Sequence, residues 1–142
     1  MRLPDELRHL ERHSLPHVEQ RLSEEFSLGW YAQMQDRDLN NANSDLTPML
    51  IEQLRSSRWT EDERFSLMEL AIACVDEALM VDVAEPEWWP ALEQLLLTAP
   101  EIHASTMCYW AAPALQGKPE ERRYPISERM AQSWLQARSR FR

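Results

Sequence analysis

The segment Thr60–Val81, TEDERFSLMELAIACVDEALMV, predicts the helix around which the rest of the chain is expected to pack. Its first residues form a capping-box pattern, in which the side chains of Thr60 and Glu63 bind each other's backbone N–H groups, so a helix is predicted to begin here. Apolar residues then recur at helical spacing. They are Phe65, Leu67, Met68, Leu70, Ala71, Ile72, Cys74, Val75, Ala78 and Leu79. Because they occupy most of the helix surface, the segment predicts a central helix packed by neighbours on several sides.

Shorter amphipathic segments flank this helix, and prolines mark their expected starts, because the first turn of a helix needs no N–H group there. With Thr47 and Ser127 predicted as N-caps, helices are expected to begin near Pro4, Pro16, Pro48, Pro86, Pro100 and Ser127. The chain holds two glycines and no alternating run of β-branched residues, which disfavours hairpin-rich sheets. We therefore expect an all-α, compact single-domain bundle of about six or seven helices, or a stack of helical hairpins.

Charge divides the 142-residue chain unevenly. The net charge is −9, with −13 over residues 1–117 and +4 over residues 118–142. We expect an acidic body, then a basic linker and a C-terminal helix. The apolar face of that helix, formed by Ile126, Met130, Trp134, Ala137 and Phe141, should dock on the body, since it would otherwise face water.

Composition also excludes several classes of protein. The N-terminus lacks the apolar core of a signal peptide, and charges at Glu69, Asp76 and Glu77 interrupt the longest apolar run. Cys74 and Cys108 have no zinc-ribbon or disulfide-framework spacing, and no glycine-rich nucleotide loop occurs. The acidic net charge disfavours nucleic acid. We expect a cytoplasmic protein that binds neither membranes nor nucleic acids and needs no cofactor.

His9 and His13 are four residues apart, a spacing that on one helix lets two imidazoles share a metal ion, and Glu6 could add a carboxylate. His17 follows at the same interval, but Pro16 prevents one straight helix from carrying all three. Zinc sites usually need three or four protein ligands. We therefore expect a solvated face and no metal site, with a metal-dependent enzyme that uses His9, His13 and nearby carboxylates as an alternative.

Other possible sites fail on their spacing. The loop Asp36–Thr47 matches the first ligands of a calcium-binding EF-hand, but it has Asn41 in place of the glycine and Thr47 in place of the bidentate glutamate. An Asn- and Asp-rich turn is the expected structure. Glu69 and Asp76, on one face of the central helix, are interpreted as a solvated stripe. No serine lies in a strand–turn–helix elbow, so an enzyme is not favoured and no catalytic residue is assigned.

Six tryptophans form the most informative surplus, and the stretch Glu85–Pro90, EPEWWP, sets two of them among acids and prolines. Adjacent helical residues point about 100° apart, so Trp88 and Trp89 cannot easily face the same core. Partial exposure of one would suit a binding hot spot, whereas half-burial of both between helices is the alternative. The predicted acidic patch comprises Trp59, Glu61, Asp62, Asp82, Glu85, Glu87, Trp88 and Trp89.

These features predict a non-enzymatic, acidic protein-binding domain. In its sharpest form it inhibits a basic, toxin-like partner by occlusion, as bacterial immunity proteins and antitoxins neutralise nuclease toxins, with acids meeting a cationic groove and indoles anchoring the contact. A helical adaptor or scaffold module with a non-basic partner is the first alternative, and the metal-dependent enzyme is the second. This expectation is an analogy based on charge, size and the missing catalytic pattern.

Overall fold

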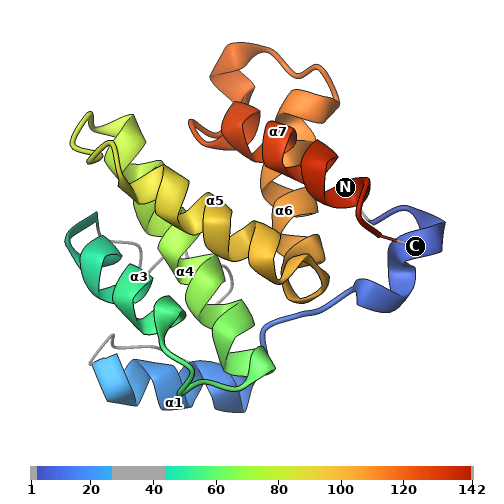
Figure 1. The fold of residues 1–142 in the computed structure, drawn as a ribbon. Helices are drawn as coiled ribbons and strands as arrows, with labels where there is room; N and C mark the ends of the chain where they lie inside the picture. The colour runs from blue at the N-terminus through green and yellow to red at the C-terminus, as the bar shows by residue number, and fades with distance from the viewer. Residues whose placement is uncertain (1–2, 27–43, 142) are drawn as a thin grey trace. The chain divides into compact units, whose positions relative to one another are not determined.

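A computed structural model describes residues 3–26 and 44–141 of the chain. These residues form helices and turns and contain no strand, which confirms the all-α class (Figure 1). The helices are η1 Asp5–Leu10, α1 Pro16–Phe26, η2 Ser44–Leu46, α3 Thr47–Arg55, α4 Glu61–Met80, α5 Trp88–Thr98, α6 Pro100–Leu115, η3 Glu120–Arg122 and α7 Ser127–Arg138, where η marks a 3-10 helix. None of the helices in these two ranges is both long and apolar enough to span a membrane.

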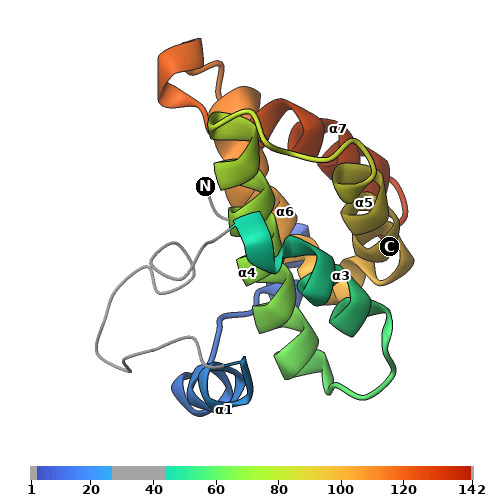
Figure 2. The ribbon, with the colours of Figure 1, turned by 90° about the vertical axis from the view of Figure 1, so that its left-hand side faces the viewer.

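The fold separates into two compact units, one formed by Met1–His13 with Glu93–Arg142 and the other by Ser14–Leu92. In the second unit, α4 is the central helix, as predicted, and α1, α3 and η2 pack against it (Figure 2). The capping box is present. Thr60 Oγ1 accepts from the Glu63 backbone N–H at 3.2 Å, and Glu63 Oε1 accepts from the Thr60 N–H at 3.0 Å.

The core of this unit is formed by the predicted apolar positions of α4 together with residues from its neighbours. Its largest buried side chains include Phe65, Met68, Ile72, Leu50, Leu54 and Leu22. Each such side chain contributes about 1.5–3 kcal/mol on burial, so the three packed helices stabilise one another. The predicted solvated stripe is wrong for Asp76, which is only 6% exposed, because neighbours cover α4 on that side as well.

The first unit is organised by α6 and α7, which pack against each other. Ile126, Met130, Trp134 and Ala137 are buried as predicted, and the Phe141 ring lies 6.3 Å from that of Trp134. The C-terminal helix therefore docks by its apolar face. Basic residues at the end of α7 and just after it also find acceptors, since Arg138 pairs with Glu6 at 3.3 Å and Arg140 donates to the Leu97 carbonyl at 3.0 Å.

Three predicted helix starts need correction. Thr47 and Ser127 are the first residues of α3 and α7 and not their N-caps, because the residues before them, Leu46 and Ile126, already have helical dihedral angles. An N-cap residue normally has extended dihedrals. The Ser127 hydroxyl instead accepts from the Tyr124 N–H at 3.2 Å. The helix expected from Pro86 begins two residues later, at Trp88.

One prediction concerns residues 27–43. Most of the calcium-like loop Asp36–Thr47 lies outside the described residues. The single-domain organisation of residues 1–142 stays a prediction.

Candidate protein-binding surface

The predicted acidic patch is divided between the two ends of α4. Trp59, Glu61 and Asp62 lie at its N-terminal end, whereas Asp82 and the residues up to Trp89 follow its C-terminal end. A 20-residue helix is about 30 Å long. The two groups therefore cannot form one continuous rim, and each has to be considered separately.

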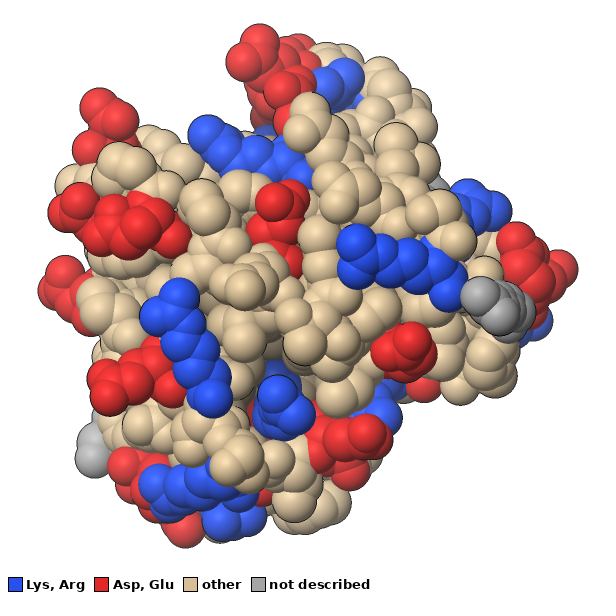
Figure 3. Space-filling view, viewed as in Figure 1, with Lys and Arg blue, Asp and Glu red and all other residues tan. Residues whose placement is uncertain are grey.

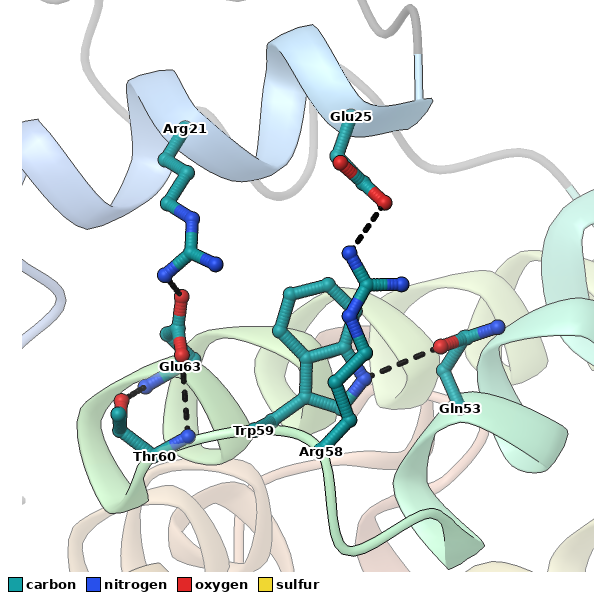
Figure 4. A network of polar contacts seen from close by, with 7 residues as sticks. All are labelled: Arg21, Glu25, Gln53, Arg58, Trp59, Thr60 and Glu63. Carbon is teal, nitrogen blue, oxygen red and sulfur yellow. Dashed lines mark hydrogen bonds and ion pairs between the residues drawn. The ribbon is translucent and has the colours of Figure 1, made fainter.

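At the N-terminal end, the Trp59 side chain is only 5% exposed and belongs to the core. Its Nε1–H donates to Gln53 Oε1 at 3.0 Å, and the Arg58 guanidinium lies 4.3 Å above the indole (Figure 4). The Phe26 ring is 5.8 Å away. An indole that anchors a partner is exposed and has a free N–H group, and Trp59 has neither. This burial argues against Trp59 as a contact for a partner.

Ion pairs complete this network. Arg21 pairs with the buried carboxylate of Glu63, and Arg58 pairs with Glu25 at 2.6 Å (Figure 4). Burial opposes ionisation of Glu63, but the hydrogen bonds from Thr60 and the nearby Arg21 charge outweigh it, so the pKa of Glu63 lies below its ordinary value of 4.5. The N-terminal end of α4 thus satisfies its own polar groups and joins α1 to α4.

The C-terminal end is different, because apolar side chains face solvent there. Met80, Val81 and Val83 are 67%, 57% and 52% exposed. Four exposed acids lie in the same stretch, which we call the acidic turn (residues 77–89): Glu77, Asp82, Glu85 and Glu87. In Figure 3, acidic side chains gather with uncharged surface at the edge of the molecule where Figure 1 places the turn after α4.

The two adjacent tryptophans belong to this turn. Trp88 and Trp89 are both half-buried at the first residues of α5, which is the alternative that the sequence left open. The backbone N–H of Trp88 donates to the Glu85 carbonyl at 3.1 Å, so the acidic segment is joined directly to the start of α5. Both indoles keep part of their surface available beside the acids.

The backbone of the acidic turn is a Schellman motif with an uncommon residue at its key position. Val83 N–H donates to the Ala78 carbonyl at 2.9 Å and Asp82 N–H to the Leu79 carbonyl at 3.3 Å, as this motif requires. Asp82 has a φ of +60°, a conformation that glycine adopts at no steric cost. Aspartate there costs stability of order 1 kcal/mol.

Electrostatics at this end also oppose folding. The last turn of α4 carries no basic residue, and Glu77 and Asp82 lie at the negative end of the helix dipole. Each such acid costs about 0.3–1 kcal/mol. A turn that combines exposed apolar groups, a strained aspartate and unfavourable acids violates several local folding preferences together, and such violations are expected at functional positions.

His9, His13 and Glu6, the residues of the metal-dependent alternative, are not arranged as a site. The 3-10 helix η1 ends at Leu10, so His9 and His13 do not share an α-helical face, and both are exposed. His13 Nε2 lies 3.6 Å from Glu11 Oε1, while Glu6 pairs with Arg138. Among residues 3–26 and 44–141, no group of three or more His, Cys, Asp or Glu side chains is placed to hold a metal ion.

Sequence reasoning missed Met80, Val81 and Val83, to which it assigned no role. The sequence signal for their exposure was their position at the expected end of the helix, next to acids. In the structure they follow Ala78, the last buried residue of α4. Comparisons with protein-family models, curated proteins and solved structures found no match to this chain.

Proposed function

We propose that this chain is a non-enzymatic protein-binding domain that inhibits a basic partner protein, in the manner of an immunity protein or antitoxin. The observation that carries the proposal is the acidic turn, where Met80, Val81 and Val83 are more than half exposed between acids. Apolar groups surrounded by polar ones are the usual anatomy of a protein interface.

The two kinds of side chain have different tasks. Met80 and the two valines supply apolar area that loses water on contact, and the half-buried Trp88 and Trp89 add indole surface, which is enriched at hot spots. Asp82, Glu85 and Glu87 face the partner's cations, which accelerates association and rejects acidic competitors. A stable interface buries about 800 Å² on each side, which is more than one turn provides. The acidic turn therefore forms the centre of the interface, and the surface around it forms the rest.

Inhibition follows from occlusion. A partner that acts on nucleic acid carries a cationic groove for phosphates. The carboxylates of the acidic turn stand in for those phosphates and fill the groove, and the exposed apolar residues prevent exchange with a simple polyanion. The inhibitor itself needs no reactive group.

A site-specific photo-crosslinking experiment tests this proposal. A photoreactive amino acid replaces Val81 in cells that produce the protein, and the same replacement at Leu135, exposed on α7, is the control. We expect a basic protein to be crosslinked from position 81 and not from position 135. With that protein purified, the association rate should fall by about tenfold or more between low and high salt.

Other outcomes separate the alternatives. A neutral or acidic protein crosslinked only from position 81, with an association rate insensitive to salt, would support the adaptor or scaffold module and overturn the inhibitor. No crosslink specific to position 81 would overturn the protein-binding role of the turn. The metal-dependent alternative gains no support from the positions of His9 and His13.

A further inference from the structure

The unit formed by Met1–His13 with Glu93–Arg142 contains an open pocket at the C-terminal end of α6. Its volume is about 370 Å³, within the range of small-molecule sites. The lining residues come from α6, the following turn and the segment around η3: Tyr109, Ala112, Pro113, Gln116, Lys118, Arg122 and Tyr124. None of them belongs to the acidic turn.

The charge of this lining is opposite to that of the chain as a whole. Lys118 and Arg122 are cationic, the two tyrosines and Gln116 offer further donors, and no carboxylate is among the lining residues. The chain holds 24 acidic residues, and Glu120 and Glu121 lie in the same segment without lining the pocket. Such a set of donors favours a ligand that accepts hydrogen bonds and carries negative charge.

Aromatic rings form the second feature of the pocket. The rings of Tyr109 and Tyr124 are stacked, with centroids 6.0 Å apart and planes 27° apart, and their hydroxyl groups lie 3.1 Å from each other. Trp110 is buried against both, with centroid distances of 4.7 Å to Tyr124 and 5.5 Å to Tyr109. Its Nε1–H has no hydrogen-bond partner in the described part of the chain. A flat ring suits these surfaces.

The pocket is held by contacts of the turn itself. Lys118 N–H donates to the Pro113 carbonyl at 3.0 Å, which closes the end of α6. Arg123 donates from Nε to the Lys118 carbonyl at 2.6 Å and from Nη1 to Glu128 at 3.0 Å. Arg123 therefore links the turn to α7, and Lys118 and Arg122 are the cations that line the pocket.

We propose that this pocket binds a small molecule with an anionic group, a carboxylate or a phosphate, on a planar ring. Lys118 and Arg122 bind the anionic group, and the Tyr109 and Tyr124 rings contact the flat part. This site does not depend on the proposed inhibitory function, because it uses different residues in the other unit.

Nuclear magnetic resonance titration of the full chain tests the site, with phenyl phosphate, benzoate, inorganic phosphate and benzyl alcohol as probes. The reporter is the indole N–H resonance of Trp110, which contacts the tyrosines, and that of Trp134, in the same unit, is the internal control. We expect phenyl phosphate and benzoate to shift the Trp110 resonance saturably. Phosphate and benzyl alcohol, each lacking one half of the ligand, should bind several-fold more weakly.

Variants separate this site from general charge attraction. Arg122→Gln should weaken binding of phenyl phosphate about tenfold, as expected for one charge-assisted hydrogen bond, whereas Arg129→Gln on α7, with the same change in net charge, should leave it within about twofold. Tyr109→Leu, at a residue that is 45% exposed, should weaken phenyl phosphate and not inorganic phosphate.

Three outcomes would overturn the proposal. One is no saturable shift with either ring-bearing anion, and another is an equal loss in the Arg122 and Arg129 variants. The third is equal binding of phosphate and phenyl phosphate, which would indicate an adventitious ion only.

Discussion

Two helix ends in this protein have the same backbone design and opposite chemistry. Both α4 and α6 end in Schellman motifs, closed by Val83 N–H to the Ala78 carbonyl and by Lys118 N–H to the Pro113 carbonyl. The residue with positive φ is Gly117 after α6, at +67°, and Asp82 after α4, at +60°. The α6 end thus uses the residue that favours the motif, and the α4 end does not.

The surrounding charges repeat this contrast. Lys118 and Arg122 follow α6, where cations complement the negative end of the helix dipole. At the α4 end, Glu77 and Asp82 oppose the dipole, and apolar side chains beside them face solvent. The two turns share a backbone motif, so the acids and exposed apolar residues of the acidic turn are not needed to form it.

The largest expected effect is on partner binding. Replacing both Glu85 and Glu87 with lysine should lower the affinity for the basic partner about 100-fold, because like charges then face each other across the interface. The matched control replaces Glu120 and Glu121, which follow the C-terminal end of α6, with lysine. It should change the affinity less than about threefold. Isothermal titration calorimetry measures both. Equal losses in the two variants would show that only net charge matters.

The other end of α4 provides the next test, because its acid favours folding. The Glu63 pKa lies below its ordinary value of 4.5, so the ionised group stabilises the protein above pH 4.5, and this stabilisation is lost as the pH falls through the lowered pKa. Glu63→Gln should lower the free energy of unfolding by about 2 kcal/mol at pH 7.

Urea denaturation at several pH values measures this difference, which should shrink below pH 4.5. A difference that stays constant down to acidic pH would contradict the role assigned to the Glu63 carboxylate. Glu61→Gln, at an exposed acid of the same helix turn, is the control and should have a smaller effect.

Exchanging the residues with positive φ tests the comparison directly. Asp82→Gly should raise the free energy of unfolding by about 1 kcal/mol, and Gly117→Asp should lower it by about the same amount, since glycine is the least strained residue in this conformation. An added Cβ at Gly117 meets open space, so only backbone strain acts there. Thermal unfolding measures both changes, and effects of the same sign would refute the argument.

The smallest effect concerns the helix dipole. Glu77→Lys in the last turn of α4 should stabilise the protein by about 0.5 kcal/mol at low salt, and the gain should decline as salt is added. The same measurement on Glu101→Lys, in the first turn of α6, should show destabilisation, because the dipole has the opposite sign there. A gain in both variants would point to net charge alone.

Features formed by residues close together in the sequence were predictable. The capping box of Thr60 and Glu63 involves residues three apart, and the docking face of α7 repeats at helical spacing, so both were confirmed. The burial of Trp59 was not predictable, because Phe26 and Gln53, which contact it, come from other helices. The residues of the predicted acidic patch lie at both ends of α4, which a 20-residue helix separates by about 30 Å.

The all-α class, the central helix and the packing face of the C-terminal helix follow from periodicity and capping, which act within a few residues. The three-dimensional packing was needed to show which tryptophans are buried, that Asp76 lies inside, that Met80, Val81 and Val83 face water, and that Tyr109 and Tyr124 line one pocket. Exposure depends on what packs against each position, and the residues that do so are distant in the chain.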